Sequence, residues 1–268
     1  MNSSNNTHEA AWTLIVAAIM IIVPGTLFAQ FGTGAPTNQE EVADGPAPSR
    51  DLTGVWMRYV PDGEFRSNAT FTEVPPKLTK WGEERFAANK NSNAGGFSLA
   101  ETNDPVITRC YPPGVPRVYF HPYPFEFVHT PKDTIMLYEY DHMVRRIYTD
   151  GRGHPDPDVQ VPLWMGHSIG RWADDTTFVV DTVGFNDRTW LDRSGIPHSE
   201  ALHVTEVFHR MSQKNMELEL TMEDPVALAE PWSATLYFRL APVTWELGEI
   251  SCSGDYQDFS SFEDFLEN

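Results

Sequence analysis

The chain has 268 residues, a formal net charge of −19 and only two cysteines. A surface this acidic repels phosphate backbones, which argues against nucleic-acid binding. Two cysteines cannot build a cysteine-rich zinc cluster or a disulfide-dense miniprotein. With 41% hydrophobic residues, the chain is too apolar for a disordered protein and too polar for a polytopic membrane protein. We therefore expect one sizeable globular domain.

The N-terminal region predicts export. Residues 10–29 form a nearly continuous apolar stretch that ends in Pro24, Gly25 and small residues, as the core of a signal peptide does. The leader before it has no Lys or Arg, and about 20 apolar residues also suit an uncleaved membrane anchor. We predict a signal peptide or an N-terminal anchor over 1–29, the anchor being a tether to the membrane. The remainder is then periplasmic or secreted.

Export also predicts the oxidation state of the two cysteines. In an oxidising compartment Cys110 and Cys252 are expected to form one disulfide, with a catalytic thiol as the alternative. Residues 30–50 are rich in Gly and Pro without an apolar period, which is typical of a linker. No basic residue follows Arg239, so residues 253–268 are expected to form an acidic C-terminal tail.

The chain between these ends reads mostly as β-strands. Short turns rich in Asp, Gly, Pro and Asn separate several of the runs. Leu78–Asn91 is the best helix candidate, with Thr79 as its N-cap. The predicted strands are Gly54–Val60, Glu64–Phe71, Phe125–Thr130, Thr134–Tyr140, Val144–Thr149, His167–Ala173, Thr176–Phe185, Val204–Met211, Met216–Met222 and Ser233–Leu240. The fold class is then all-β: an up-and-down, lipocalin-like antiparallel β-barrel with one short helix over residues 51–252.

Two sets of motifs carry a resemblance. Gly54-Val55-Trp56 on the first predicted strand resembles the Gly-x-Trp signature of lipocalins and other calycins, in which the Trp plugs one end of the barrel. A second set resembles a family of exported bacterial proteins and implies a shared architecture, although it names no reaction. Its runs are DGRGHP (150–155), GHSIGRW (166–172), DTTFVVDTVGF (175–185), PHSEALHVTEVF (197–208) and MEDP (222–225).

Histidines are the most frequent of the residues that can carry chemistry. Eight of the nine lie between residues 121 and 209. Histidine exchanges protons near neutral pH and is also the commonest metal ligand. No pair has HExxH spacing, and His198 and His203 are five residues apart, which places them on opposite faces of a strand. We predict neither a metal nor a cofactor, with a zinc or iron site built from several histidines as the alternative.

The catalytic candidates combine histidines with carboxylates. We predict His167, Asp181, His198 and Glu206, because such groups together supply an acid, a base and an orienting partner. A barrel interior lined by tyrosines and methionines suits a flat, largely apolar ligand, and these polar groups are expected to be set within it. The direction in which Asp181 and Glu206 point depends on the pairing register of their strands.

The candidates for substrate binding lie in and beside two loops. The long loop 184–201 is expected to be a lid or a binding loop, or alternatively a solvated surface loop held by Arg–Asp pairs. Arg152 projects from the turn after the strand of Arg146 and is expected to pair with Asp181 or with a substrate carboxylate. The predicted binding residues are Arg146, Arg152, Tyr138, Trp190, Asp187 and Asp192.

These patterns favour a cofactor-independent enzyme of lyase or isomerase type. It would act on an apolar or aromatic small molecule by isomerisation, hydration, dehydration or cyclisation. The alternative is a non-catalytic extracytoplasmic carrier of such a molecule, and a third reading is a structural protein of the cell envelope. Phosphate-binding glycine loops, GxSxG and CxxC are absent from the sequence, which argues against nucleotide, α/β-hydrolase and thioredoxin chemistry.

Overall fold

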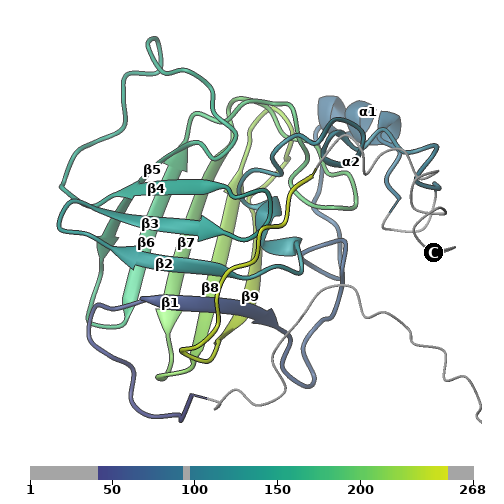
Figure 1. Cartoon of the computed structure of the whole chain (residues 1–268). Helices are drawn as coiled ribbons and strands as arrows, with labels where there is room; N and C mark the ends of the chain where they lie inside the picture. Colours follow the sequence, from purple (N-terminus) through teal and green to yellow (C-terminus); the bar gives the residue numbers. More distant parts are fainter. Residues whose placement is uncertain (1–41, 93–96, 253–268) are drawn as a thin grey trace, which may run out of the picture. The chain divides into compact units, whose positions relative to one another are not determined.

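A closed barrel of nine strands forms the centre of the molecule (Figure 1). The computed structural model describes residues 42–92 and 97–252, so the predictions for 1–29, for most of 30–50 and for 253–268 lie outside the described residues. Each strand is hydrogen-bonded to the next in chain order, and β9 closes onto β1. The strands are β1 (Gly54–Tyr59), β2 (Phe125–His129), β3 (Asp133–Tyr138), β4 (Val144–Tyr148), β5 (His167–Trp172), β6 (Thr177–Val183), β7 (His203–Arg210), β8 (Asn215–Glu223) and β9 (Trp232–Leu240). The all-β barrel predicted from the sequence is thus confirmed.

Alternating side chains decide which face of each strand is buried. In β6, Phe178, Val180 and Thr182 are buried, while the residues between them are partly exposed. β7 and β8 follow the same period of two, so their apolar residues also point into the barrel. The inward-facing side chains of the strands therefore form the hydrophobic core. It includes Trp56, Phe125, Phe127, Met136, Ile147, Phe208, Leu218, Leu220 and Phe238.

One predicted strand is wrong. Residues 64–71 contain no strand, because local hydrogen bonds turn the backbone there. The Ser67 hydroxyl accepts from the backbone N–H groups of Ala69 (3.0 Å) and Thr70 (3.1 Å). A serine that satisfies nearby backbone donors in this way competes with strand pairing.

One strand pair departs from the antiparallel pattern. β4 and β5 run parallel, with Ile147 opposite Ser168 and Tyr148 opposite Ile169. A two-residue hairpin cannot join parallel strands, so the chain must cross back to the end where β4 began. Residues 149–166 make this crossover, and they contain the DGRGHP turn.

The barrel carries two α-helices and one 3₁₀ helix instead of a single helix. α1 (Lys80–Ala88) lies within the predicted range, and the Thr79 side chain accepts from the N–H of Gly82 (3.1 Å) as the predicted N-cap. α2 (Pro105–Arg109) and the 3₁₀ helix η1 (Arg117–Phe120) are too short to give a helical period in the sequence. η1 contributes to the core, because its Tyr119 enters the barrel and packs against Phe125 and Phe238.

The Gly-x-Trp motif begins β1 and buries its tryptophan in the core. Trp56 is fully buried, its indole N–H donates to the carbonyl of Leu52 (2.8 Å), and the Arg210 guanidinium lies 5.1 Å from the ring centroid. Gly54 has a φ of 121°, and a Cβ there would meet the Leu240 side chain at 2.7 Å. Glycine is therefore required at this position by both its backbone conformation and the close approach of β9.

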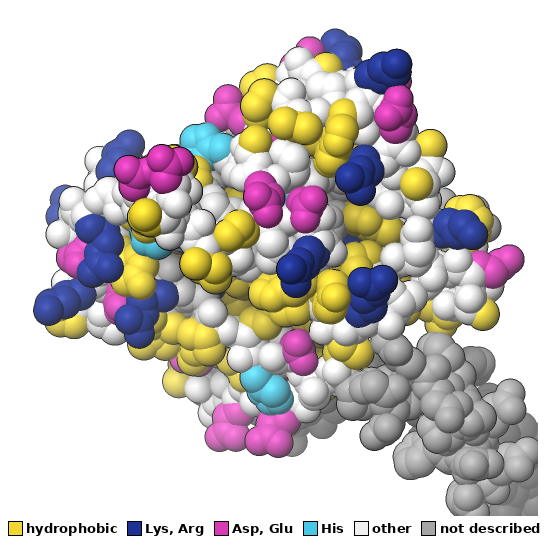
Figure 2. All heavy atoms as spheres, turned by 90° about the horizontal axis from the view of Figure 1, so that it is seen from above, with side chains coloured by type: hydrophobic (Ala, Val, Ile, Leu, Met, Phe, Trp, Pro, Cys, Tyr) yellow, Lys and Arg dark blue, Asp and Glu magenta, His cyan; other side chains and the backbone are white. Residues whose placement is uncertain are grey.

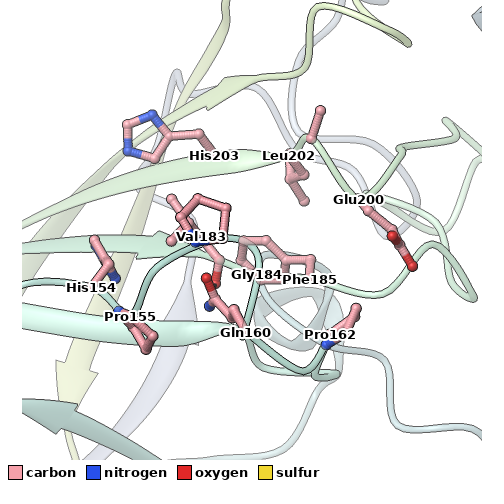
Figure 3. A pocket seen from close by; sticks show the side chains of 12 residues that line it. His154, Pro155, Gln160, Pro162, Val183, Gly184, Phe185, Glu200, Leu202 and His203 are labelled. Carbon is pink, nitrogen blue, oxygen red and sulfur yellow. The ribbon is translucent and has the colours of Figure 1, made fainter.

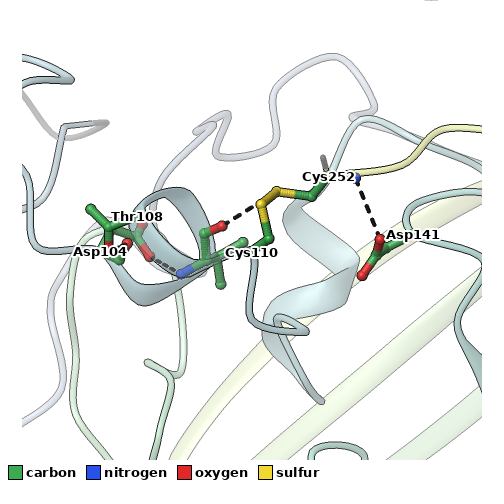
Figure 4. Close-up of a disulfide and its surroundings, with 6 residues drawn as sticks. Asp104, Thr108, Cys110, Asp141 and Cys252 are labelled. Atoms are coloured by element: carbon green, nitrogen blue, oxygen red, sulfur yellow. Dashed lines mark hydrogen bonds between the residues drawn. A yellow bond between two sulfur atoms is a disulfide. The ribbon is translucent and has the colours of Figure 1, made fainter. Parts of the chain in front are cut away.

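Cys110 and Cys252 form the predicted disulfide (Figure 4). The bond joins the end of α2 to the segment after β9, across 142 residues. The backbone N–H of Cys252 also donates to the Asp141 carboxylate (3.4 Å), and the backbone N–H of Asp141 donates to the carbonyl of Ile250 (2.7 Å). A disulfide of this kind is typical of an oxidising compartment.

The surface mixes charge and apolar groups. On the face seen in Figure 2, acidic, basic and hydrophobic side chains lie among one another, so the negative net charge is not gathered into one patch there. None of the helices in the described residues is long and apolar enough to cross a membrane.

Candidate acid–base site on the outer face of the barrel

Three polar side chains point outward from neighbouring strands. His167 of β5, Asp181 of β6 and His203 of β7 are all at partly exposed positions next to buried, inward-facing residues. Asp181 is paired with Thr205, so His203 lies on the same face two residues away. The crossover 149–166 adds His154 from outside the sheet. The barrel thus serves as a rigid base for a cluster that lies on its outer wall.

Asp181 joins two histidines. Its Oδ1 lies 2.7 Å from Nε2 of His154, and its Oδ2 lies 2.7 Å from Nε2 of His203. The second ring nitrogen of His154, Nδ1, is 2.9 Å from Nδ1 of His167. The second nitrogen of His203 is 3.4 Å from a carboxylate oxygen of Glu223. The result is a continuous chain of polar contacts across four strands, β5 to β8, and the crossover.

The hydrogen bonds define where protons sit in this cluster. Burial opposes ionisation of Asp181, but hydrogen bonds from His203 and His154 outweigh it and lower the pKa of the carboxyl. An ionised Asp181 accepts from Nε2–H of both histidines. Burial, together with nearby His154 and Arg152, lowers the pKa of His167, so its ring is neutral at neutral pH. When neutral His154 keeps its proton on Nε2, its Nδ1 accepts from Nδ1–H of His167, and Nε2 of His167 carries a free lone pair.

Aromatic stacking fixes the outer end of the chain. The ring of Tyr148 stacks on His167 at 5.2 Å and 26°, and the Arg152 guanidinium lies 3.9 Å from the Tyr148 ring centroid. Arg152 was expected to pair with Asp181 or a substrate, but it pairs with Asp150 two residues before it, at 2.6 Å. The tight Asp-Gly turn brings the two side chains together, so this pairing is local. Arg152 therefore lies beside the cluster on the ring of Tyr148, without pairing with Asp181.

A cavity of about 500 Å³ opens beside the cluster (Figure 3). His154 and His203 lie at one side of it, and Glu200 lies at the other. Gly184 forms part of the wall with a φ of 73°, and a Cβ there would collide with the Gln160 side chain at 1.8 Å. The remaining lining is mostly apolar: Pro155, Pro157, Pro162, Val183, Phe185, Ala201 and Leu202. Small, mostly apolar cavities with a few polar groups are typical ligand sites.

The other predicted catalytic carboxylate faces the opposite way. Glu206 is fully buried inside the barrel, where it accepts from the Tyr119 hydroxyl (2.6 Å) and from Nη1 of Arg145 (2.8 Å), and Nη2 of Arg145 contacts its second oxygen. Burial raises the pKa of Tyr119 well above its ordinary value, so this hydroxyl stays protonated. Arg145 also donates to Ser168 and Thr182. Every oxygen of Glu206 is thus engaged by the protein itself.

The predicted binding residues are dispersed. Tyr138 is buried in the barrel, where burial raises its pKa to about 12. Arg146 lies on the outer face of β4 beside Asp133 (3.4 Å), away from the cavity lining. Within the described part of the chain, no hydrogen bond, ion pair or ring contact joins either residue to Asp181 or its histidines.

The loop 184–201 is packed instead of solvated. His198 is buried, its Nε2 lies 3.4 Å from the Thr189 hydroxyl, and burial lowers its pKa. Asp192 is fully buried and accepts from the backbone N–H groups of Ser194, Gly195 and Ile196, at 2.9, 3.1 and 3.3 Å. These bonds hold the loop in shape.

The other two loop residues lie near a second, smaller cavity of about 80 Å³. Trp190 is buried under the Arg117 guanidinium (5.3 Å), and exposed Asp187 lies with it along this cavity. His198 also lines it. The loop therefore places its predicted residues apart from Asp181.

The structure brings together two of the four predicted catalytic residues, His167 and Asp181. Their shared partner His154 and the second histidine, His203, were noted in the sequence but not selected. The period of two would have placed His203 on the face of Asp181 once Val180 and Val204 were both assigned inward. Among the described residues, no group of three or more His, Cys, Asp or Glu is arranged to hold a metal ion.

No family model, curated protein or solved structure matches this chain. The closed barrel is consistent with a lipocalin-like architecture, and the resemblance of its motifs to exported bacterial proteins stays a prediction. Function must then be argued from the geometry of the site.

Proposed function

We propose that this protein is an exported enzyme that binds a small, largely apolar molecule in the outer cavity and moves a proton on it. The observation that carries the proposal is the contact of Asp181 with two histidines, each at 2.7 Å, beside the cavity of about 500 Å³. His154 and His203 both line this cavity. An ionised carboxylate that accepts from a histidine orients the ring and stabilises its protonated form.

Two histidines on one carboxylate suit isomerase or lyase chemistry. Such reactions remove a proton at one atom of the substrate and deliver a proton or release a leaving group at another. His203 can exchange a proton with the substrate through Nδ1, which lies 3.4 Å from Glu223, and His154 can exchange one with His167 through the contact between their Nδ1 atoms (2.9 Å). The relevant residues need no bound group to perform these steps.

Export rests on two supports. The disulfide between Cys110 and Cys252 suits an oxidising compartment, and residues 1–29 have the composition of a signal peptide or anchor. We propose a periplasmic or secreted location on these grounds.

The test compares turnover by matched variants. Purified protein is incubated with a small-molecule extract of the source organism, and mass spectrometry follows which compounds are consumed and formed. We expect His154→Gln and Asp181→Asn to lower the rate by about 10²- to 10⁴-fold, the usual contribution of general acid–base catalysis. His209→Gln, on the same outer face of β7 but outside the cluster, is the control.

A carrier gives a different result. It would bind a compound from the extract without converting it, and the same variants would alter only binding. Unchanged rates in both Asp181→Asn and His154→Gln would exclude the proposed role of the cluster.

A further inference from the structure

The walls of the outer cavity carry an unbalanced set of charges. Among the twelve residues that line it there is one carboxylate, Glu200, and neither a lysine nor an arginine. Glu200 is exposed to solvent. Its side chain lies on the opposite side of the cavity from His154 and His203 (Figure 3).

More carboxylates surround this lining. Asp156 and Asp158 flank the lining residue Pro157, and a hydrogen bond of 3.0 Å between the backbone of Asp158 and the Asp156 side chain holds them together. Asp181 contacts both lining histidines, and Glu223 lies 3.4 Å from His203. Five carboxylates therefore lie at or next to the cavity.

Arg152 offsets them only in part. It stacks on Tyr148 beside the cluster, and both oxygens of Asp150 accept from its guanidinium, at distances from 2.6 to 3.1 Å. Asp150 therefore balances the charge of Arg152 locally. Carboxylates that surround a low-dielectric cavity attract cations and disfavour anions.

We propose that the cavity selects a small organic amine, bound as the ammonium, and that Glu200 is the residue that determines this specificity. The inference rests on the proposed function and names its substrate class. The ammonium group lies toward Glu200, and the apolar body packs on Pro155, Phe185 and Leu202. The far end of the molecule then faces His154 and His203, where the proton is moved.

The test uses three probes that share a 4-fluorophenyl ring and are cationic, neutral and anionic at neutral pH: 4-fluorobenzylamine, 4-fluorobenzyl alcohol and 4-fluorobenzoate. Fluorine NMR titrations of the full protein at neutral pH measure the three dissociation constants. We expect the amine to bind at least about tenfold more tightly than the benzoate, with the alcohol between them, and this preference to shrink as salt is added.

Matched charge variants locate the preference. Glu200→Gln should weaken amine binding by about three- to fivefold and leave the alcohol unchanged, since one partly exposed ion pair is lost. Glu219→Gln removes the same charge from an exposed position on β8 and should change neither. Equal or tighter binding of the benzoate, or unchanged amine binding in Glu200→Gln, would overturn the amine specificity.

These outcomes are separate from the test of the reaction. When Asp181→Asn abolishes turnover but the benzoate binds best, acid–base catalysis stands and the amine specificity is wrong. When the amine preference holds but Asp181→Asn turns over normally, the specificity stands and the catalytic role fails. Absence of binding by all three probes contradicts the cavity as a ligand site and thus both proposals.

Discussion

The ion pair inside the barrel makes a prediction about stability. Glu206 is fully buried and its charge is matched by Arg145, which is 1% exposed. Burial alone would lower the pKa of Arg145, but the facing Glu206 carboxylate raises it well above its ordinary value. In Glu206→Gln, the neutral amide leaves this guanidinium charged and without a counter-ion in the core.

The expected loss is large for one substitution. Breaking a buried ion pair by removing one partner costs about 3–5 kcal/mol. This is a sizeable part of the free energy of unfolding of a typical protein, about 5–15 kcal/mol. For a domain of this size, about 2–4 °C is lost per kcal/mol, so the melting temperature of Glu206→Gln should fall by about 6–20 °C. Urea unfolding followed by tryptophan fluorescence measures the free energy, and thermal unfolding gives the temperature.

A double variant tests whether the loss of stability comes from leaving one buried charge unpaired. Replacing both partners, as Arg145→Met with Glu206→Leu, removes the charges together and should recover most of the lost stability. Tyr119→Phe deletes only the hydroxyl that donates to Glu206 and should cost about 1–2 kcal/mol. The reasoning is refuted when Glu206→Gln stays within about 1 kcal/mol of the unchanged protein, or when the double variant is no more stable than the single one.

Three further predictions concern other parts of the molecule. Cys110→Ser frees Cys252 and opens a loop of 142 residues, so urea unfolding should show a loss of about 3–5 kcal/mol. Gly54→Ala should cost about 2 kcal/mol or more, because φ is 121° and the new Cβ would meet Leu240. Burial lowers the pKa of His198 below its ordinary value of 6.5. Just below pH 6.5 the unfolded chain therefore binds more protons at this histidine than the folded chain does. The free energy of unfolding should rise with pH up to 6.5 and level off above it.

Controls accompany these three measurements. With reducing agent present, the unchanged protein should lose as much stability as Cys110→Ser; a loss below about 1 kcal/mol in both would contradict the role of the bond. Gly153→Ala is the match for Gly54→Ala, since its φ is not positive and nothing lies within 4 Å of the added Cβ. His198→Gln should flatten the rise of unfolding free energy below pH 6.5, and an unchanged slope would assign that rise to other groups.

The strands were predictable because their signal is local. All nine observed strands overlap predicted runs, because the alternation of apolar and polar residues can be recognised within each run alone. The exception, 64–71, depends on the hydroxyl of Ser67, and the parallel pairing of β4 with β5 depends on a long crossover. Neither is encoded in the period of the residues. The entry of Tyr119 into the core from a short 3₁₀ helix was not predicted either.

The site was predicted only in part because it depends on register and on distant contacts. His167 and Asp181 were selected for their chemistry, and they do lie in one cluster. Their link is His154, which contacts Asp181 across 27 residues, and the second histidine contacts it across 22. Glu206 was assigned to the same site, although it is an even-numbered neighbour that points inward while Asp181 points outward. A shift of one residue in register would exchange these two faces.

The parallel pairing of β4 with β5 separates the segment that lines the cavity from the strands that form the barrel core. Because these strands run the same way, the crossover 149–166 must return along the outside of the sheet, and it is this return that supplies His154 and much of the cavity wall. Side chains of 154–162 line the cavity and are not part of the barrel core. Substitutions and insertions there can therefore reshape the cavity while the nine strands still close.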